Sequence, residues 1–123
     1  MARALLVALA FLASTPVALA GDVTGIWMRD DGSAKLRFSA CGGDTICGFL
    51  AWKKEPGGSS RIGQQLFSDM KPNGADSWAG SAFNPNDGKL YTAKLTLSND
   101  HLVTAGCVFG GLVCKSFGWT RVR

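Results

Sequence analysis

Turn-forming residues recur at short intervals from Gly25 to the end of the chain, and no other feature constrains the fold as strongly. Between these glycine, asparagine, aspartate and proline positions lie short segments rich in β-branched and aromatic residues, a pattern typical of all-β proteins. The spacing predicts eight strands and no helix of useful length. The predicted strands cover residues 25–30, 34–40, 48–54, 62–69, 78–83, 89–97, 101–109 and 114–122.

Alternating apolar residues indicate how these strands assemble. On the sixth strand one face is apolar and consists of Tyr91, Ala93, Leu95 and Leu97. Eight short antiparallel strands in consecutive hairpins must protect their edges, and an up-and-down barrel removes the edges altogether. A two-sheet sandwich is the competing arrangement, but the chain lacks the tryptophan and cysteine pattern of immunoglobulin domains. The sequence therefore predicts a small antiparallel up-and-down barrel.

The N-terminal segment has the order of a secretory signal peptide. A cation precedes a short apolar run, and Ala18 and Ala20 form a small-x-small cleavage site. The apolar run is shorter than the ~20 residues that a membrane-spanning helix needs. We therefore expect residues 1–20 to be removed and residues 21–123 to form one exported domain, periplasmic or secreted, with no membrane span.

Four cysteines occur as two local pairs, Cys41 with Cys47 and Cys107 with Cys114. Zinc sites usually draw on closer spacings with histidine support, and the chain has a single histidine, His101. A redox-active pair is usually Cys-x-x-Cys, which is missing here. In an oxidising compartment, local pairs favour disulfides, each flanking its own chain reversal. We predict these two disulfides, with a metal site and a redox pair as the alternatives.

Composition and motifs argue against two classes of function. The net charge is +4 over 123 residues and no basic run exceeds Lys53-Lys54, whereas nucleic-acid binding needs a clustered basic face. His101 lies in a predicted turn, and no nucleophile-elbow motif surrounds a serine. The acidic segment at residues 84–88 lacks the ligand spacing of a calcium loop and is typical of a turn. We expect no nucleic-acid partner, no cofactor, no metal and no enzyme activity.

The interior of the predicted barrel suggests a binding function. A closed barrel of eight strands is just wide enough to hold one small ligand or to be filled by its own side chains. The candidates for the interior are Leu36, Phe38, Phe49 or Trp52, Tyr91 and Leu95. They are apolar apart from the Tyr91 hydroxyl, so we predict a small apolar or amphipathic ligand. The alternative is a filled barrel that serves as an envelope or protein-interaction part, and cavity volume separates the two.

Two tryptophan motifs, Gly25-Ile26-Trp27 and Trp119-Thr120-Arg121, lie in the first and the last predicted strand. Gly25-Ile26-Trp27 resembles the Gly-x-Trp opening of lipocalin-like (calycin) barrels, where an arginine of the last strand packs on the tryptophan at the closed end. Arg121 is the arginine that matches this pattern. A cation over an indole face contributes about 0.5–2 kcal/mol, so the resemblance implies a structural role for Trp27 and Arg121.

The chain from residue 25 onwards also resembles the DUF2147 family of small exported bacterial proteins. The resemblance is carried by "GIWMRDDGSAKLRF", "CGGDTICGFLAWKK", "WAGSAFNPNDGKLYTAKLTL" and "GWTRV". It implies a lipocalin-like barrel and no particular activity, because the function of that family is not established. The segment "KEPGGSS" at residues 54–60 departs from the family pattern, which usually has a longer loop there. No role of that loop is therefore carried over.

Overall fold

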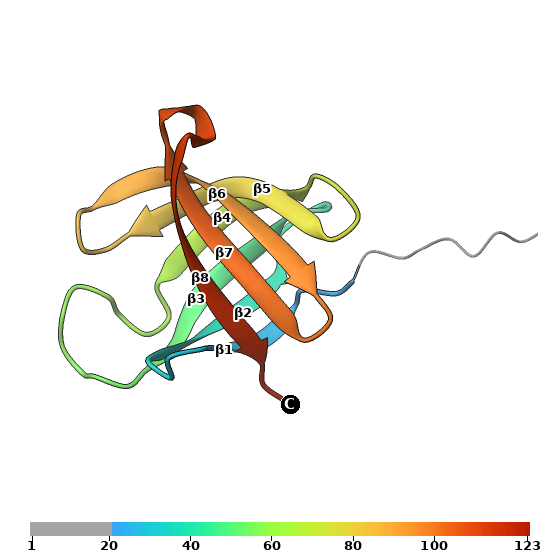
Figure 1. The fold of residues 1–123 in the computed structure, drawn as a ribbon. Coiled ribbons are helices and arrows are strands. Elements are labelled where there is room, and N and C mark those ends of the chain that lie inside the picture. The colour runs from blue at the N-terminus through green and yellow to red at the C-terminus, as the bar shows by residue number, and fades with distance from the viewer. Residues whose placement is uncertain (1–20) are drawn as a thin grey trace, which may run out of the picture.

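The computed structural model describes residues 21–123, which form one closed barrel (Figure 1). Eight antiparallel strands follow one another in chain order, and the last pairs with the first. They are β1 (Gly25–Arg29), β2 (Ala34–Ala40), β3 (Ile46–Lys53), β4 (Gln65–Pro72), β5 (Ser77–Asn84), β6 (Lys89–Ser98), β7 (His101–Val108) and β8 (Val113–Arg121). The predicted all-β up-and-down barrel is confirmed. The predicted signal peptide, residues 1–20, lies outside the described residues.

One strand, β4, begins later than predicted because a tight turn precedes it. The amide of Gln64 donates to the carbonyl of Arg61 at 3.0 Å, and the amide of Gly63 donates to the carbonyl of Leu50 at 2.7 Å. Gly63 has a φ of 89°, a left-handed conformation that a residue with a side chain rarely adopts. Residues 61–64 therefore turn the chain, and the strand starts at Gln65.

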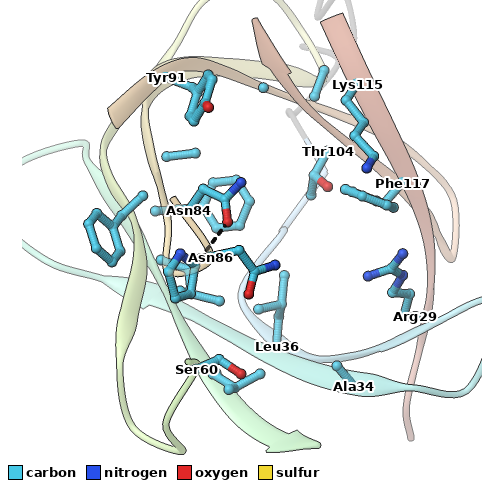
Figure 2. A pocket seen from close by; sticks show the side chains of 18 of the residues that line it. Arg29, Ala34, Leu36, Ser60, Asn84, Asn86, Tyr91, Thr104, Lys115 and Phe117 are labelled. Carbon is cyan, nitrogen blue, oxygen red and sulfur yellow. Dashed lines mark hydrogen bonds between the residues drawn. The ribbon is translucent and has the colours of Figure 1, made fainter. Parts of the chain in front are cut away.

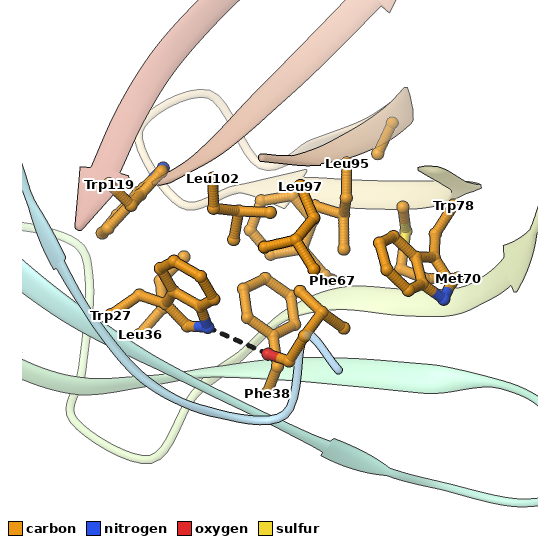
Figure 3. Packing of buried hydrophobic residues seen from close by; sticks show 12 residues of the cluster. Trp27, Leu36, Phe38, Phe67, Met70, Trp78, Leu95, Leu97, Leu102 and Trp119 are labelled. Carbon is orange, nitrogen blue, oxygen red and sulfur yellow. Dashed lines mark hydrogen bonds between the residues drawn. The ribbon is translucent and has the colours of Figure 1, made fainter. Parts of the chain in front are cut away.

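Inward-facing side chains from most strands pack into one hydrophobic core, which includes Trp27 of the N-terminal strand (Figure 3). The largest fully buried side chains are Val23, Trp27, Leu36, Phe38, Met70, Leu95 and Leu102. On β6, Ala93, Leu95 and Leu97 are buried while the residues between them are exposed, as the alternation predicts. Figure 3 shows side chains of β1 and β2 packed against those of β6 and β7.

The end of the barrel near the C-terminus is closed by Trp27 and Arg121. The two residues pair across the seam between β1 and β8, and Arg121 Cζ lies 4.4 Å from the centroid of the Trp27 ring. Arg121 Nη1 donates to the Thr24 carbonyl at 3.0 Å, and Nη2 donates to the Asp22 carbonyl at 2.6 Å. Trp27 Nε1 donates to the Val23 carbonyl at 2.9 Å. The segment before β1 is therefore tied across this end, which we call the closed end.

Asp100 adds a carboxylate to the closed end. Its Oδ1 accepts a hydrogen bond from Arg123 and lies 3.4 Å from Arg121 Nε. The hydrogen bond from Arg123 and the positive charges of both arginines hold the pKa of Asp100 below its usual value. Because this pKa is lower in the folded than in the unfolded state, the ionised carboxylate stabilises the fold above about pH 4. That contribution is lost as the pH falls through the folded-state pKa.

We expect Asp100→Asn to lower the urea midpoint at neutral pH, and we expect its difference from the unmodified protein to shrink at about pH 3. Urea unfolding followed by tryptophan fluorescence at both pH values measures the two differences. Asp44→Asn, in an exposed turn, is the control and should change little at either pH. If Asp100→Asn lowers the urea midpoint by the same amount at both pH values, the stabilisation by ionised Asp100 is contradicted.

The cysteines pair as predicted. The Sγ atoms of Cys41 and Cys47 lie 2.10 Å apart, and those of Cys107 and Cys114 lie 2.09 Å apart. The first disulfide spans the turn between β2 and β3, next to the closed end. The second joins β7 to β8 at the opposite end, where Cys107 and Cys114 are register partners. No free cysteine remains among the described residues.

Beyond the second disulfide the chain projects as a hairpin tip (Figure 1). The tip contains the short 3₁₀ turn η1 (Phe109–Gly111), the one helical element of residues 21–123. Phe109 and Leu112 are 77% and 86% exposed. In the part of the chain that the structure describes, no helix has the length and apolar character needed to cross a membrane.

Candidate functional site

A cavity of about 400 Å³ lies at the barrel end opposite Arg121 (Figure 2). Here β1, β3, β5 and β7 end and the following strands begin, so four connections surround the opening. Ser60, Pro85 and Asn86 bring two of those connections to the mouth of the cavity. The volume lies within the range of about 300–1,000 Å³ that small-molecule sites occupy.

The inner part of the cavity is apolar. Its main lining residues are Leu36, Leu50, Leu66, Phe67, Phe117 and Trp119. Thr104 is the buried polar residue of this region, and its hydroxyl oxygen accepts a hydrogen bond from Trp119 Nε1 at 2.9 Å. This bond satisfies both buried polar groups and fixes the indole ring in the cavity wall. The inner surface therefore suits an apolar group.

The mouth of the cavity carries neutral polar side chains, namely Ser60, Asn84, Asn86 and Tyr91. Asn84 Oδ1 accepts a hydrogen bond from the backbone amide of Asn86 at 2.9 Å, which holds the turn after β5. The Tyr91 hydroxyl donates to the carboxylate of Asp87. This hydrogen bond lowers the pKa of Asp87 and raises the pKa of Tyr91. Within residues 21–123 no group of three or more histidine, cysteine or acidic side chains is placed to hold a metal ion.

The connection between β3 and β4 forms one side of the mouth. Lys53 Nζ donates to the backbone carbonyls of Gly57 and Ser60. These contacts fold the segment 54–60 back toward the end of β3 and bring Ser60 to the cavity. The shortened loop seen in the sequence is therefore part of the opening.

Two cationic side chains, Arg29 and Lys115, also belong to the lining (Figure 2). Arg29 pairs with Trp119 across the β1–β8 seam, and Lys115 pairs with Gly106 on β7. Directly paired residues share a face of the sheet, and both partners line the cavity, so the two cations occupy interior positions. Arg29 Cζ lies 3.9 Å and Lys115 Nζ lies 5.5 Å from the centroid of the Phe117 ring.

Four of the predicted ligand-binding residues face the interior, at two different depths. Leu36 and Tyr91 line the cavity, at its inner end and its mouth. Phe38 and Leu95 are 1% and 0% exposed, and both belong to the packed core beyond the cavity wall. That Leu36 and Tyr91 contact a ligand stays a prediction.

Trp52 is the exception, because it faces outwards. It is 37% exposed and does not line the cavity. The cause is a β-bulge: Lys35 pairs with Trp52, but the next residue, Leu36, pairs with Leu50, which leaves Ala51 as an extra residue. A bulge reverses the alternation of the strand on its far side. The expectation of an interior Trp52 is therefore corrected, and Leu50 takes the interior position.

Sequence reasoning missed the two cations and Phe117. The alternation of β8 contains the signal that could have found them, since Lys115, Phe117, Trp119 and Arg121 occupy every second position. The resemblance to lipocalin-like barrels places Arg121 in the interior. The same face then includes Lys115 at the other end of the strand.

A closed up-and-down barrel of eight strands with a cavity at one end defines the lipocalin-like class of small β-barrels. Within that class, the chain belongs to the family described as "Uncharacterized protein conserved in bacteria (DUF2147)", whose profile matches residues 25–121. The match spans all eight strands and confirms the resemblance seen in the sequence. Searches among curated proteins and among solved structures found no match to this chain.

Proposed function

We propose that this protein binds a small apolar or amphipathic molecule inside its barrel and acts outside the cytoplasm as a carrier or sensor of that molecule. The observation that carries the proposal is the cavity of about 400 Å³, apolar inside and open at its mouth. A filled barrel would have side chains in this space. Export is supported by the signal-peptide pattern of residues 1–20 and by the two disulfides.

The lining suits binding better than catalysis. Among the described residues that surround the cavity there is no carboxylate, imidazole or thiol, the groups that most often act as acid, base or nucleophile. The Tyr91 hydroxyl is engaged with Asp87 outside the lining. The remaining polar groups are amides, hydroxyls and two cations, which can orient a ligand through hydrogen bonds and charge.

Contact with a protein partner is the second candidate function, and the exposed hairpin tip favours it. Phe109, Leu112 and Val113 are 77%, 86% and 57% exposed on a projection of the barrel. Apolar side chains that gather on a surface often mark a contact site. The experiment below separates the two candidates, because this second function needs no occupied cavity.

Gly106 offers a direct way to fill the cavity. It lines the cavity, and a Cβ added there would have Tyr91 Cβ at 3.7 Å as its nearest neighbour, an ordinary contact distance. We expect an environment-sensitive apolar dye to bind the unmodified protein saturably. Gly106→Leu should weaken that binding at least about tenfold, because its side chain occupies the space of the ligand.

Ser116→Leu is the matched control, since it adds the same side chain to an exposed position of neighbouring β8. It should bind the dye as the unmodified protein does, and thermal unfolding checks that both variants are folded. Unchanged dye binding by Gly106→Leu would contradict the proposed site. Absence of saturable binding of fatty acids, isoprenoids and aromatic probes to the folded, oxidised protein would favour the protein-contact function instead.

A further inference from the structure

We infer that the ligand carries an anionic head group, which Arg29 and Lys115 hold at the cavity mouth while an apolar tail enters the barrel. This inference rests on the proposed ligand-binding function and adds the charge of the ligand to it. The site that it assigns is the wall formed by Arg29, Phe117 and Lys115, which Figure 2 shows in a row along one side of the cavity.

The position of Lys115 is the first observation that supports an anionic head group. Lys115 occupies an interior position of β8, where the next two interior residues are Phe117 and Trp119. Lys115 is exposed, so its ammonium group lies at the open end of the cavity, where water or an anion can reach it. No acidic side chain of residues 21–123 lies within ion-pair distance of Lys115. The ammonium group of Lys115 can therefore pair with an anionic ligand group at the mouth of the cavity.

Arg29 supplies a second positive charge on the same wall. Its guanidinium stacks on Phe117 with Cζ 3.9 Å from the ring centroid, which orients the guanidinium plane. Asp31 Oδ2 lies 3.2 Å from Nε, and no other acidic side chain of residues 21–123 forms an ion pair with Arg29. A guanidinium edge with two N–H groups matches the geometry of a carboxylate or a phosphate.

Apart from Asp31, which pairs with Arg29 from outside the lining, these two cations have no acidic side chain near them in the cavity. No aspartate or glutamate lines the cavity. Asp87, beside the mouth, accepts the hydrogen bond of the Tyr91 hydroxyl and is not a lining residue. A cationic head group would meet two like charges and no acidic partner, whereas an anionic one would meet two donors. The charges select the sign of the head group.

The position of the charges sets the orientation of the ligand. Lys115 is exposed at the mouth and Arg29 reaches from its strand to the Phe117 ring, whereas Leu36, Phe67 and Trp119 are buried lining residues. An amphipathic anion can satisfy both regions only with its head outward and its tail inward. The shared chemistry is therefore an alkyl or isoprenoid tail with a carboxylate or phosphate head.

Displacement of a neutral bound dye by decanoate, decyl phosphate, decanol and decylamine tests the inference, because these probes share one tail. We expect at least one anion to displace the dye at roughly tenfold lower concentration than decylamine, with decanol between them. The preference should fall with added salt. Lys115→Gln and Arg29→Gln should each reduce it about threefold or more and leave decanol displacement unchanged.

Lys94→Gln and Arg37→Gln are the matched controls, since each removes one positive charge from the outer surface. Lys94 is exposed on β6. Arg37 stacks on Phe49 with Cζ 5.1 Å from the ring centroid, an outer counterpart of the Arg29–Phe117 stack. Phe49, the alternative candidate for the interior, thus lies on the outer face. Both controls should keep the anion preference.

The outcomes separate this inference from the proposed function. Equal displacement by anions and amine, or a preference that persists in the double variant Arg29→Gln/Lys115→Gln, would overturn the inference and leave the binding function standing. Absence of saturable dye binding would overturn the binding function itself, whereas displacement of a bound dye by none of the four probes would overturn the inference alone. A preference for either anion supports the inference, and comparison of decanoate with decyl phosphate identifies the head group.

Discussion

Trp27→Ala is expected to lower the free energy of unfolding by about 3–5 kcal/mol, the usual cost of removing a large buried aromatic side chain. Trp27 is fully buried at the centre of the core, so its loss leaves a void that the barrel can fill only in part. The substitution also leaves the Val23 carbonyl without the indole hydrogen bond and Arg121 without its ring. Urea unfolding followed by circular dichroism measures the loss.

Arg121→Lys separates the contribution of the guanidinium from that of the indole. Lysine keeps the charge over Trp27 but cannot donate to the carbonyls of Thr24 and Asp22 in the same geometry. We expect a loss of about 1 kcal/mol, smaller than that of Trp27→Ala. Unfolding midpoints that neither substitution changes would show that Trp27 and Arg121 do not hold the closed end together.

Gly80→Ala is expected to be the second most damaging substitution, with a loss of about 3 kcal/mol from overpacking. Gly80 lies on β5 opposite an irregular stretch of β4, where the register shifts between Ser68 and Lys71. An added Cβ would stand 2.5 Å from the Asp69 carbonyl oxygen and 2.7 Å from that of Ser68. These are backbone atoms, so the strands themselves must separate to admit the methyl group.

Gly106→Ala is the control for Gly80→Ala, because it adds the same methyl group to a strand glycine that has room for it. The nearest atom to the new Cβ would be 3.7 Å away. Thermal unfolding should place Gly106→Ala close to the unmodified protein and Gly80→Ala far below it. Similar unfolding temperatures for the two variants would contradict the crowding at β4.

The number of strands and the closure of the barrel could be predicted because both depend on local signals. Turn residues fix where each hairpin reverses, and the alternation on β6 shows which face is buried. Irregular pairing could not be predicted in the same way. The bulge at Ala51 depends on how β3 meets β2, and it alone turns Trp52 outwards. Such a feature arises from contacts between strands and leaves no mark within one strand.

The cavity was harder to predict than the interior face. Leu36, Phe38 and Leu95 obey the same alternation, yet only Leu36 reaches the cavity. Depth along the barrel depends on the register of all strands together, which no single segment contains. The alternation therefore indicated that these three side chains point inward, and the pairing of strands determined which of them surround empty space.

The seam between β1 and β8 explains why the tryptophan motifs lie at the two ends of the chain. In residues 21–123, seven of the eight strand pairings join sequence neighbours, and the eighth brings β1 to β8 through three residue pairs. Joining segments so distant in the chain costs more conformational entropy than forming any single hairpin. Trp27 and Arg121 form one of those three pairs. Their contact holds the β1–β8 seam together at the closed end of the barrel. The residues at the open end are therefore not needed to close the barrel.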